Sequence, residues 1–203
     1  MRTGPKYKIA KRLGPSVFEK TQSQKFAIAA ERAERSRRGR RGGRSEYAKQ
    51  ILEKQKVRMT YGISEKQFRT YVHRALAHGA GEPVARLHEL LEMRLDNVAY
   101  RLGLAPSRRA ARQLIAHGHL TVNGKKVRVP SYPVTLTDRL AVRDGSKAHG
   151  GLVGYNERFM ERPLPSWLSW NPKSMEGAVT ERPTQASAAP AGDLAAVLSF
   201  YTR

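Results

Sequence analysis

The residues in this sequence that could do chemistry are basic and polar side chains at helical and turn spacings. Arg108 and Arg112 lie four residues apart, which places both on one face of a helix. Asn123-Gly124 follows, the dipeptide preferred in two-residue hairpin turns because both turn residues need positive φ, and Lys125 comes directly after it. Guanidinium and ammonium groups held on one rigid face bind phosphate oxygens. The pattern therefore predicts recognition of a polyanion, with no catalytic residue.

Thiol and metal chemistry have little support in the sequence. The chain contains no cysteine, which excludes disulfides, thiolate nucleophiles, iron–sulfur clusters and cysteine zinc sites. It contains six histidines, but no His-x-x-x-His pair lies beside a glutamate at ligand spacing. We interpret the histidines as scattered polar or RNA-facing residues, and we expect no metal and no cofactor.

The charge balance narrows the class of partner. The 203 residues carry a net charge of +21, from 38 Lys and Arg against 17 Asp and Glu. A compact protein of this charge repels itself unless a polyanion lies nearby: nucleic acid, an anionic membrane surface or an acidic protein. No apolar run approaches a membrane span and no secretory signal is visible, so a membrane role would be peripheral. We expect a cytoplasmic protein that binds nucleic acid.

Nearly half of the basic residues lie in the first 60 positions, and they are densest at residues 35–44. Glycines and like charges disfavour a packed helix or strand there. The segment is either a solvated flexible arm or, as we favour, a segment that becomes ordered on RNA phosphates. The candidate phosphate ligands in it are Arg37, Arg38, Arg40, Arg41 and Arg44.

Helices and strands are expected in a definite order around these residues. Ser45 predicts the start of a helix that Gly62 ends, and Ser64 with Gln67 reads as a capping box for the next helix. A leucine stripe over residues 87–102 predicts helix with a bend at 93–97. A helix over 107–118, a hairpin over 120–129 and a strand over 139–143 follow. Nearer the end, Trp167 and Trp170 suggest a packed extended segment. Residues 184–192 read as a linker or surface loop, and Asp193 predicts the start of a last helix.

Several of these motifs resemble a known RNA-binding domain. Arg94-Leu95-Asp96-Asn97-Val98, Ser107 to Gln113, Val122-Asn123-Gly124-Lys125 and Arg128-Val129-Pro130-Ser131-Tyr132 closely resemble the S-four domain. The flanks, Glu53 to Arg58, Gln67-Phe68-Arg69, Pro165-Ser166-Trp167-Leu168 and Met175-Glu176-Gly177, look like the S-four family of small-subunit ribosomal proteins. The resemblance runs from about Gly4 to Tyr201, nearly the whole chain.

The resemblance implies an α+β fold, with an S-four domain inserted after a helical domain. The implied domains are a basic extension at 1–44, a helical domain at 45–93, the S-four domain at 94–145, and a segment at 146–203 that packs back on the helical domain. The inserted domain would hold two helices, a β-hairpin and a further strand. The resemblance also implies that the protein is located in the ribosome and has no enzymatic activity.

The implied function is primary binding of small-subunit ribosomal RNA, at a helix junction in its 5′ domain, to nucleate assembly. Neighbouring proteins S-five and S-three and the messenger RNA entry region are implied partners, with an influence on decoding accuracy. The RNA-binding residues expected outside the basic arm are Lys54, Lys56, Arg58, Arg69, Arg108, Arg109, Arg112, Gln113, His117, Asn123, Gly124 and Lys125.

The sequence also departs from the family's usual pattern. The zinc-holding cysteines of many relatives are absent, and residues 38–43 replace a common Pro-Gly-Gln-His-Gly loop. Ser199 stands where a glutamate is usual, and Ala110 where an acid is frequent. The RNA contacts of that common loop are therefore not carried over to residues 38–43.

Two other functional classes share the same motifs. Arg94-Leu95-Asp96 is similar to the Arg-Leu-Asp of pseudouridine synthases, in which the aspartate is the nucleophile, but here an amphipathic helix follows it. We therefore interpret Asp96 as a helix-start residue or an intradomain partner. A free-standing RNA chaperone is the other alternative, although such proteins generally lack the flanking segments named above.

Overall fold

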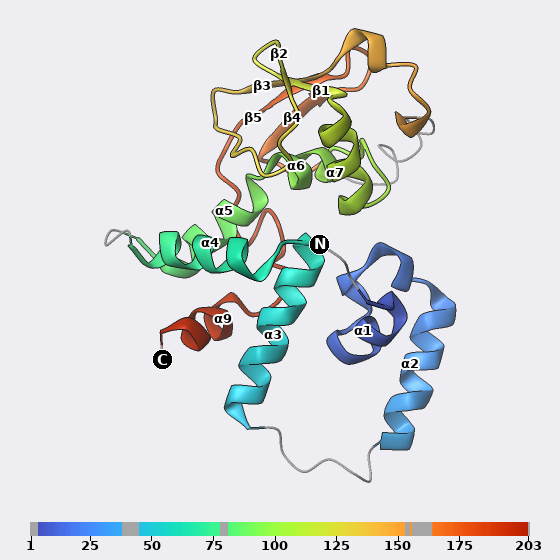
Figure 1. Ribbon diagram of the computed structural model, residues 1–203, viewed down its shortest axis with the longest axis vertical. Coiled ribbons are helices and arrows are strands. Elements are labelled where there is room, and N and C mark those ends of the chain that lie inside the picture. Colours follow the sequence, from blue (N-terminus) through green and yellow to red (C-terminus); the bar gives the residue numbers. More distant parts are fainter. Residues whose placement is uncertain (1–3, 38–44, 78–80, 153–154, 156–163, 203) are drawn as a thin grey trace. The chain divides into compact units, whose positions relative to one another are not determined.

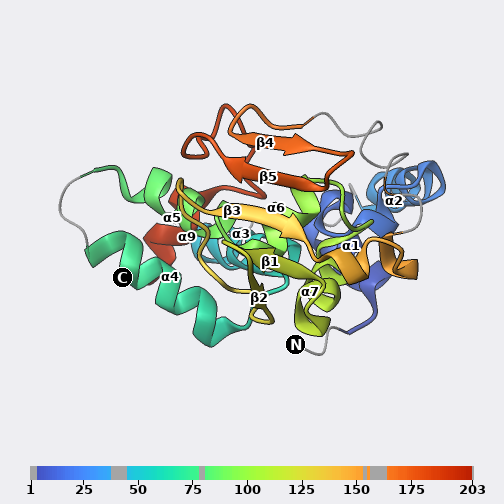
Figure 2. The same ribbon diagram turned by 90° about the horizontal axis from the view of Figure 1, so that it is seen from above.

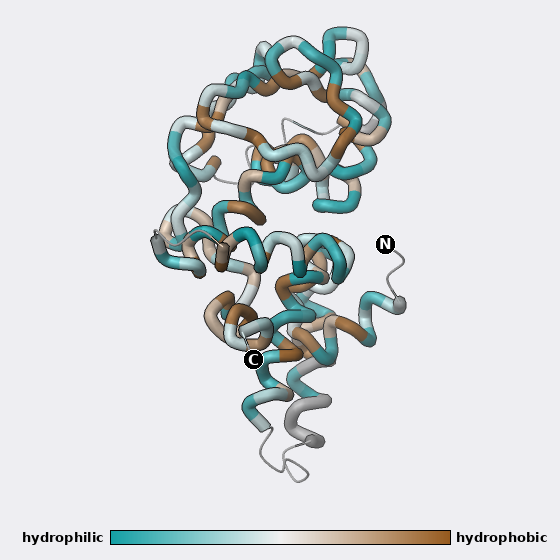
Figure 3. Tube along the Cα trace, turned by 60° about the vertical axis from the view of Figure 1, so that its left-hand side comes forward, coloured by the Kyte–Doolittle hydropathy of each residue, from teal (hydrophilic) through white to brown (hydrophobic). Residues whose placement is uncertain are grey.

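The computed structural model describes residues 4–37, 45–77, 81–152, 155 and 164–202. The chain forms two compact units, one made of residues 1–87 and 190–203 and the other of residues 88–189. Along both, hydrophobic and hydrophilic residues alternate (Figure 3), as expected for elements that bury one side only. In the described part of the chain, no helix is long and apolar enough to cross a membrane.

The first unit is helical. Its elements are α1 (Lys6–Leu13), η1 (Pro15–Val17), η2 (Glu19–Thr21), α2 (Gln24–Arg37), α3 (Glu46–Tyr61), α4 (Glu65–Ala77) and α9 (Leu194–Tyr201), and α5 (Pro83–Glu92) leads into the second unit. The predicted caps are present: Ser45 Oγ accepts from the Ala48 amide, Gly62 adopts φ 62°, and the Gln67 amide donates to Ser64 Oγ at 3.3 Å. Helix α9 packs beside α3 although the two are far apart in sequence (Figure 1).

Part of the expected basic extension is folded. Five buried side chains form a small core there: Ala10, Leu13, Val17, Phe18 and Phe26. Leu52 and Met59 of α3 pack against this core, which ties α1, η1 and α2 to the helical unit. The charge density of residues 1–44 concealed this apolar set because its members are spread over α1, η1, the residue after η1, and α2.

The second unit combines an antiparallel sheet with two helices. Its strands are β1 (Leu120–Val122), β2 (Lys125–Val127), β3 (Arg139–Val142), β4 (Leu168–Asn171) and β5 (Glu176–Val179), in the spatial order β2-β1-β3-β5-β4 (Figure 2). Helices α6 (Leu95–Arg101) and α7 (Arg108–His117) pack on one face of the sheet (Figure 1). The α+β fold is confirmed, and so are the Asn123-Gly124 turn, with φ values of 51° and 76°, and the strand at 139–143.

The expected packing of residues 146–203 on the helical domain is wrong for most of that segment. Strand β5 pairs with β3, and β4 pairs with β5, so residues 164–189 belong to the second unit. Without this pairing, β3 would present a row of unpaired backbone groups, and Trp167 and Trp170 would not be buried. Only residues 190–203 belong to the helical unit.

Candidate nucleic-acid interface

A buried carboxylate anchors one of the two arginines on which the predicted site depends. Asp96 is 1% exposed and accepts from Arg94 through Nε at 3.0 Å and Nη2 at 2.7 Å. From α7, Arg112 donates to the same carboxylate through Nε at 3.1 Å and Nη2 at 2.7 Å. The Arg112 side chain remains 30% exposed. Its guanidinium is therefore held in one orientation at the surface of α7.

A second buried carboxylate anchors the other arginine through an intermediate amide. Glu92 is fully buried and accepts from Arg101 at 2.9 and 3.0 Å and from Asn97 Nδ2 at 2.8 Å. Asn97 Oδ1 then accepts from Arg108 Nε at 2.9 Å, and the Arg108 guanidinium lies 4.4 Å from the centre of the Tyr100 ring. The Asn97 amide donates to Glu92 and accepts from Arg108, so it connects the buried acid to this arginine.

The two ends of α7 are set by local capping. Ser107 Oγ accepts from the Ala110 amide at 3.2 Å, and Gly118 ends the helix in the left-handed region with φ 76°. These caps orient α7 so that Arg109, Gln113 and His117 are exposed to solvent. The exposed groups lie on the same helix as the anchored arginines, so α7 presents a rigid basic and polar surface.

The hairpin turn is held by the side chain that was expected to contact RNA. Asn123 Nδ2 donates to Asp138 Oδ1 at 2.7 Å, and Asn123 Oδ1 accepts from the Arg139 amide at 2.9 Å. Asn123 therefore ties the turn to the start of β3, while Gly124 and Lys125 are exposed. Within the described residues, neither Arg109 nor Lys125 is paired with a carboxylate.

The basic residues predicted on α3 are engaged within the helical unit. Lys54 Nζ lies 2.8 Å from Glu65 and 4.3 Å from the Phe200 ring centre, and Arg58 Nε lies 3.4 Å from Glu65. The hydroxyl of Tyr201 donates to the same carboxylate at 2.8 Å. Partial burial opposes ionisation of Glu65, but hydrogen bonds from Lys54 and Tyr201 and the nearby cations lower its pKa overall.

The remaining predicted ligands are divided between surface and undescribed residues. Lys56 pairs with Glu53 at 3.5 Å, and the exposed Arg69 donates to His73 at 3.2 Å. Arg37 is the last residue of α2. The other four candidate ligands in residues 35–44, Arg38, Arg40, Arg41 and Arg44, lie outside the described residues.

Sequence reasoning missed Glu92, and it did not connect Asp96 with the arginine that this acid positions. Glu92 and Asp96 are buried charged residues, and a charged side chain inside an apolar helix stripe was the available signal. The interpretation of Asp96 as an intradomain partner is confirmed. A carboxylate clamped by Arg94 and Arg112 has no free oxygen to attack a substrate, so the synthase-like role is wrong.

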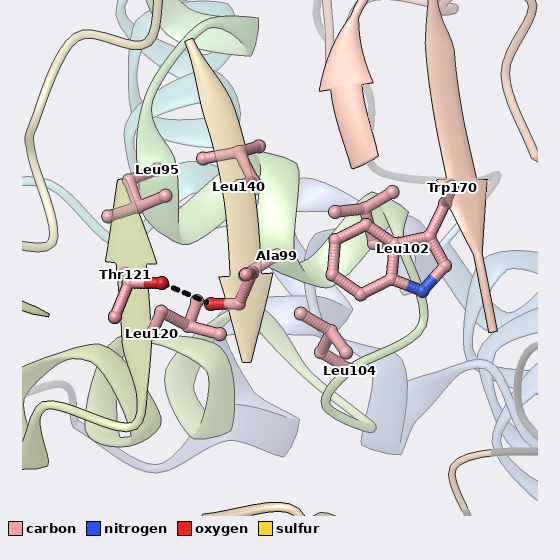
Figure 4. A pocket seen from close by; sticks show the side chains of 9 residues that line it. Leu95, Ala99, Leu102, Leu104, Leu120, Thr121, Leu140 and Trp170 are labelled. Carbon is pink, nitrogen blue, oxygen red and sulfur yellow. Dashed lines mark hydrogen bonds between the residues drawn. The ribbon is translucent and has the colours of Figure 1, made fainter. Parts of the chain in front are cut away.

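One interior cavity among the described residues of the second unit is too small for a small-molecule substrate. A cavity of about 10 Å³ lies between α6 and the sheet, lined by Leu95, Ala99, Leu102, Leu104, Leu120, Thr121, Leu140, Ala141 and Trp170 (Figure 4). Its lining is almost entirely apolar, and the Thr121 hydroxyl is already bonded to the Ala141 carbonyl at 3.3 Å. A space of this size holds one water at most.

Two consecutive parts of the chain each match a family of known proteins. Residues 1–92 match the family described as ribosomal protein S4/S9 N-terminal domain, and residues 93–140 match the S4 domain. The small ribosomal subunit protein uS4 of Roseiflexus castenholzii is 40% identical over 206 residues, covering 98% of each chain. The chain belongs to the uS4 family of ribosomal proteins. The uS4 proteins of Acetivibrio thermocellus and Cutibacterium acnes are 41% and 42% identical, each over 90% of this chain and 89% of theirs.

Proposed function

We propose that this chain is a structural, non-enzymatic protein of the small ribosomal subunit that binds the subunit's ribosomal RNA. The strongest support is the surface of α7. Arg108 and Arg112 are oriented there by buried acids, and the helix also presents Arg109, Gln113 and His117. Structured RNA presents phosphates and 2′-hydroxyls along shallow grooves, which a rigid basic surface can match by shape.

The hairpin would supply a further contact to the same RNA. Its turn is tied down by Asn123, so Lys125 is presented without the entropy loss that a flexible loop would suffer on binding. Gly124 allows close approach of the RNA backbone because it carries no side chain. In this assignment Asn123 positions the turn, and its exposed side chain also contacts RNA beside Gly124 and Lys125.

The finer assignments extend this function to particular neighbours. We propose a junction in the 5′ domain as the RNA site, a role in nucleating assembly, and contacts with proteins S-five and S-three near the messenger RNA entry region. Binding by Lys54, Lys56, Arg58, Arg69 and the arginines at 37, 38, 40, 41 and 44 belongs to this group. Lys54 and Arg58 would have to bind RNA while they remain paired with Glu65.

Salt-dependent binding of 5′-domain ribosomal RNA tests the α7 surface. Arg108 and Arg112 are unsuitable for substitution because their loss would disturb the buried acids. The double variant Arg109→Gln/Lys125→Gln removes two exposed cations instead, and we expect the slope of log affinity against log salt to become shallower by about two. A matched control, Lys20→Gln/Lys25→Gln, removes the same charge from exposed lysines of the helical unit.

Two results would contradict the proposed function. The first is a slope that changes equally in both double variants, because it would mean that only net charge matters. The second comes from exposing the purified chain to total cellular RNA and sequencing what it retains. Retention in proportion to RNA length, without enrichment of small-subunit ribosomal RNA, would show a generic polyanion binder.

A further inference from the structure

The sheet of the second unit has a second face that neither α6 nor α7 covers. The strand register places Thr121 of β1 opposite Lys126 and Ala141, and Ser169 of β4 opposite Ala178, all on this open face. An open groove of about 710 Å³ runs over it, lined largely by small side chains of β1, β3, β4 and β5. A groove floored by small residues lets an extended chain approach the sheet closely.

Three cations gather at the end of this face nearest the C-terminus of α7. The Lys126 side chain lies against Gly118, which ends α7, and the Arg143 amide donates to the His119 carbonyl at 2.9 Å. The charge of Arg128, then desolvation and the charge of Arg143, lower the pKa of Lys126, consistent with this proximity. In the part of the chain that the structure describes, none of the three forms an ion pair with a carboxylate. Unpaired like charges held together repel, and an anion placed between them would relieve that repulsion.

Imidazole rings lie beside these cations. His119 is 9% exposed, its Nδ1 is 3.0 Å from Ser146 Oγ, and its ring centre is 4.0 Å from that of the exposed His149. Burial, followed by the charges of His149, His117, Arg143 and Lys126, lowers the pKa of His119. Flat rings next to cations that no carboxylate neutralises are the combination that binds unstacked bases and their phosphates.

Other occupants fit this end of the face less well. Among the described residues, no group of three His, Asp or Glu side chains could hold a metal ion. Two acids line the groove, Asp144 and Glu176, and both act on Lys147: Asp144 pairs with it at 2.8 Å, and the charge of Glu176 helps to raise its pKa. The uncompensated charge therefore favours a polyanion.

We propose that the open face of the sheet is a second RNA-binding surface, on which Lys126, Arg128 and Arg143 bind the phosphates of an unpaired segment and His149 stacks on one of its bases. It rests on the proposed function in that the ligand is ribosomal RNA, but it uses none of the α7 or hairpin-turn residues assigned there. The segment would pass from the C-terminal end of α7 onto the sheet.

Tethered radical cleavage can separate the two surfaces. Because the chain has no cysteine, one introduced cysteine is a unique attachment point for an iron chelate. Ala148→Cys places the probe at an exposed position beside His149, and Gln113→Cys places it on the exposed surface of α7. We expect both to cleave small-subunit ribosomal RNA, at different nucleotides.

The outcomes of this experiment are distinguishable. Cleavage from position 113 but not from 148 overturns the second surface and leaves the proposed function intact. Cleavage from neither overturns both. If the probe at 148 marks a neighbouring protein in assembled subunits and no RNA, the open face is a protein interface and this inference is wrong.

Charge removal gives a quantitative check on the full chain. Lys126→Gln/Arg128→Gln should make the salt slope for ribosomal RNA shallower by about two, and Lys20→Gln/Lys25→Gln should not. His149→Ala removes the exposed ring, and we expect weaker binding with an unchanged slope. Slopes and affinities equal to those of the unmodified chain, in variants with unchanged tryptophan fluorescence, would overturn the assignment.

Discussion

Replacing Asp96 by Asn removes the charge that holds two arginines in the second unit while preserving the shape of the side chain. Asp96 accepts two bonds from Arg94 and two from Arg112. An amide keeps one accepting oxygen, but its NH₂ group faces guanidinium donors. The variant therefore has at least one unsatisfied donor pair in a buried site.

The expected loss of unfolding free energy follows from how deeply each arginine is buried. The Arg94 side chain is 3% exposed and cannot reach water, whereas that of Arg112 is 30% exposed and can. Removing one partner of a buried pair destabilises a protein by about 3–5 kcal/mol, because the other charge is left uncompensated. We expect Asp96→Asn to lower the free energy of unfolding of the second unit by that amount.

Urea unfolding followed by tryptophan fluorescence measures this unit specifically. The chain has two tryptophans, Trp167 and Trp170, and both are buried in the second unit. Asp144→Asn is the matched control, since the Asp144 side chain is 95% exposed, and it should leave the midpoint unchanged. If Asp96→Asn shifts the midpoint no further than Asp144→Asn does, the buried acid is not an anchor and the account of α7 is refuted.

Two further predictions concern the packing of the C-terminal segment in each unit. Gly177→Ala should destabilise the second unit by about 1–3 kcal/mol, because the added Cβ would meet the Ser169 carbonyl oxygen and lie 2.7 Å from the Trp170 ring. The fluorescence midpoint measures this, and Gly145→Ala, with open space around it, should change the midpoint little. In the first unit, burial and then the contact with Glu65 raise the pKa of Tyr201 above its usual 10.0, while Lys54 and Tyr201 lower that of Glu65 below 4.5 against the opposing effect of burial. Docking of α9 should therefore weaken as pH rises above about 10 or falls below about 4. Hydrogen exchange of residues 194–201 across pH, corrected for intrinsic rates, measures this, and a profile identical to that of Tyr201→Phe would contradict it.

Local signals in the sequence determined much of the secondary structure. Ser45, Ser107 and Gly118 each cap a helix through atoms within a few residues, and Asn123-Gly124 needs only its own backbone to form the turn. Such features depend on nearest neighbours in the chain, so they can be predicted from residue type and spacing. The family was also recognisable from these motifs, and the sequence identity with uS4 proteins over nearly the whole chain confirms it.

The tertiary structure decided which charged side chains can bind phosphates and which are paired within the protein. Arg112 is paired with an acid 16 residues away, and Lys54 and Arg58 meet Glu65 across two helices. From spacing alone, an arginine on an outer helix face is equally consistent with an internal anchor and with a phosphate ligand. The distinction depends on burial, which no local pattern specifies.

The division of the chain into two units was also a long-range outcome. Strand β5 joins β3 from more than 30 residues away, and α9 returns to α3 from the other end of the chain. Sheet edges and apolar helix faces accept any segment of suitable pattern, so a sequence predicts that residues 164–203 must pack without saying where. Burial of Trp167 and Trp170 on the sheet, and of Leu194, Val197 and Leu198 in the helical unit, determines the two destinations.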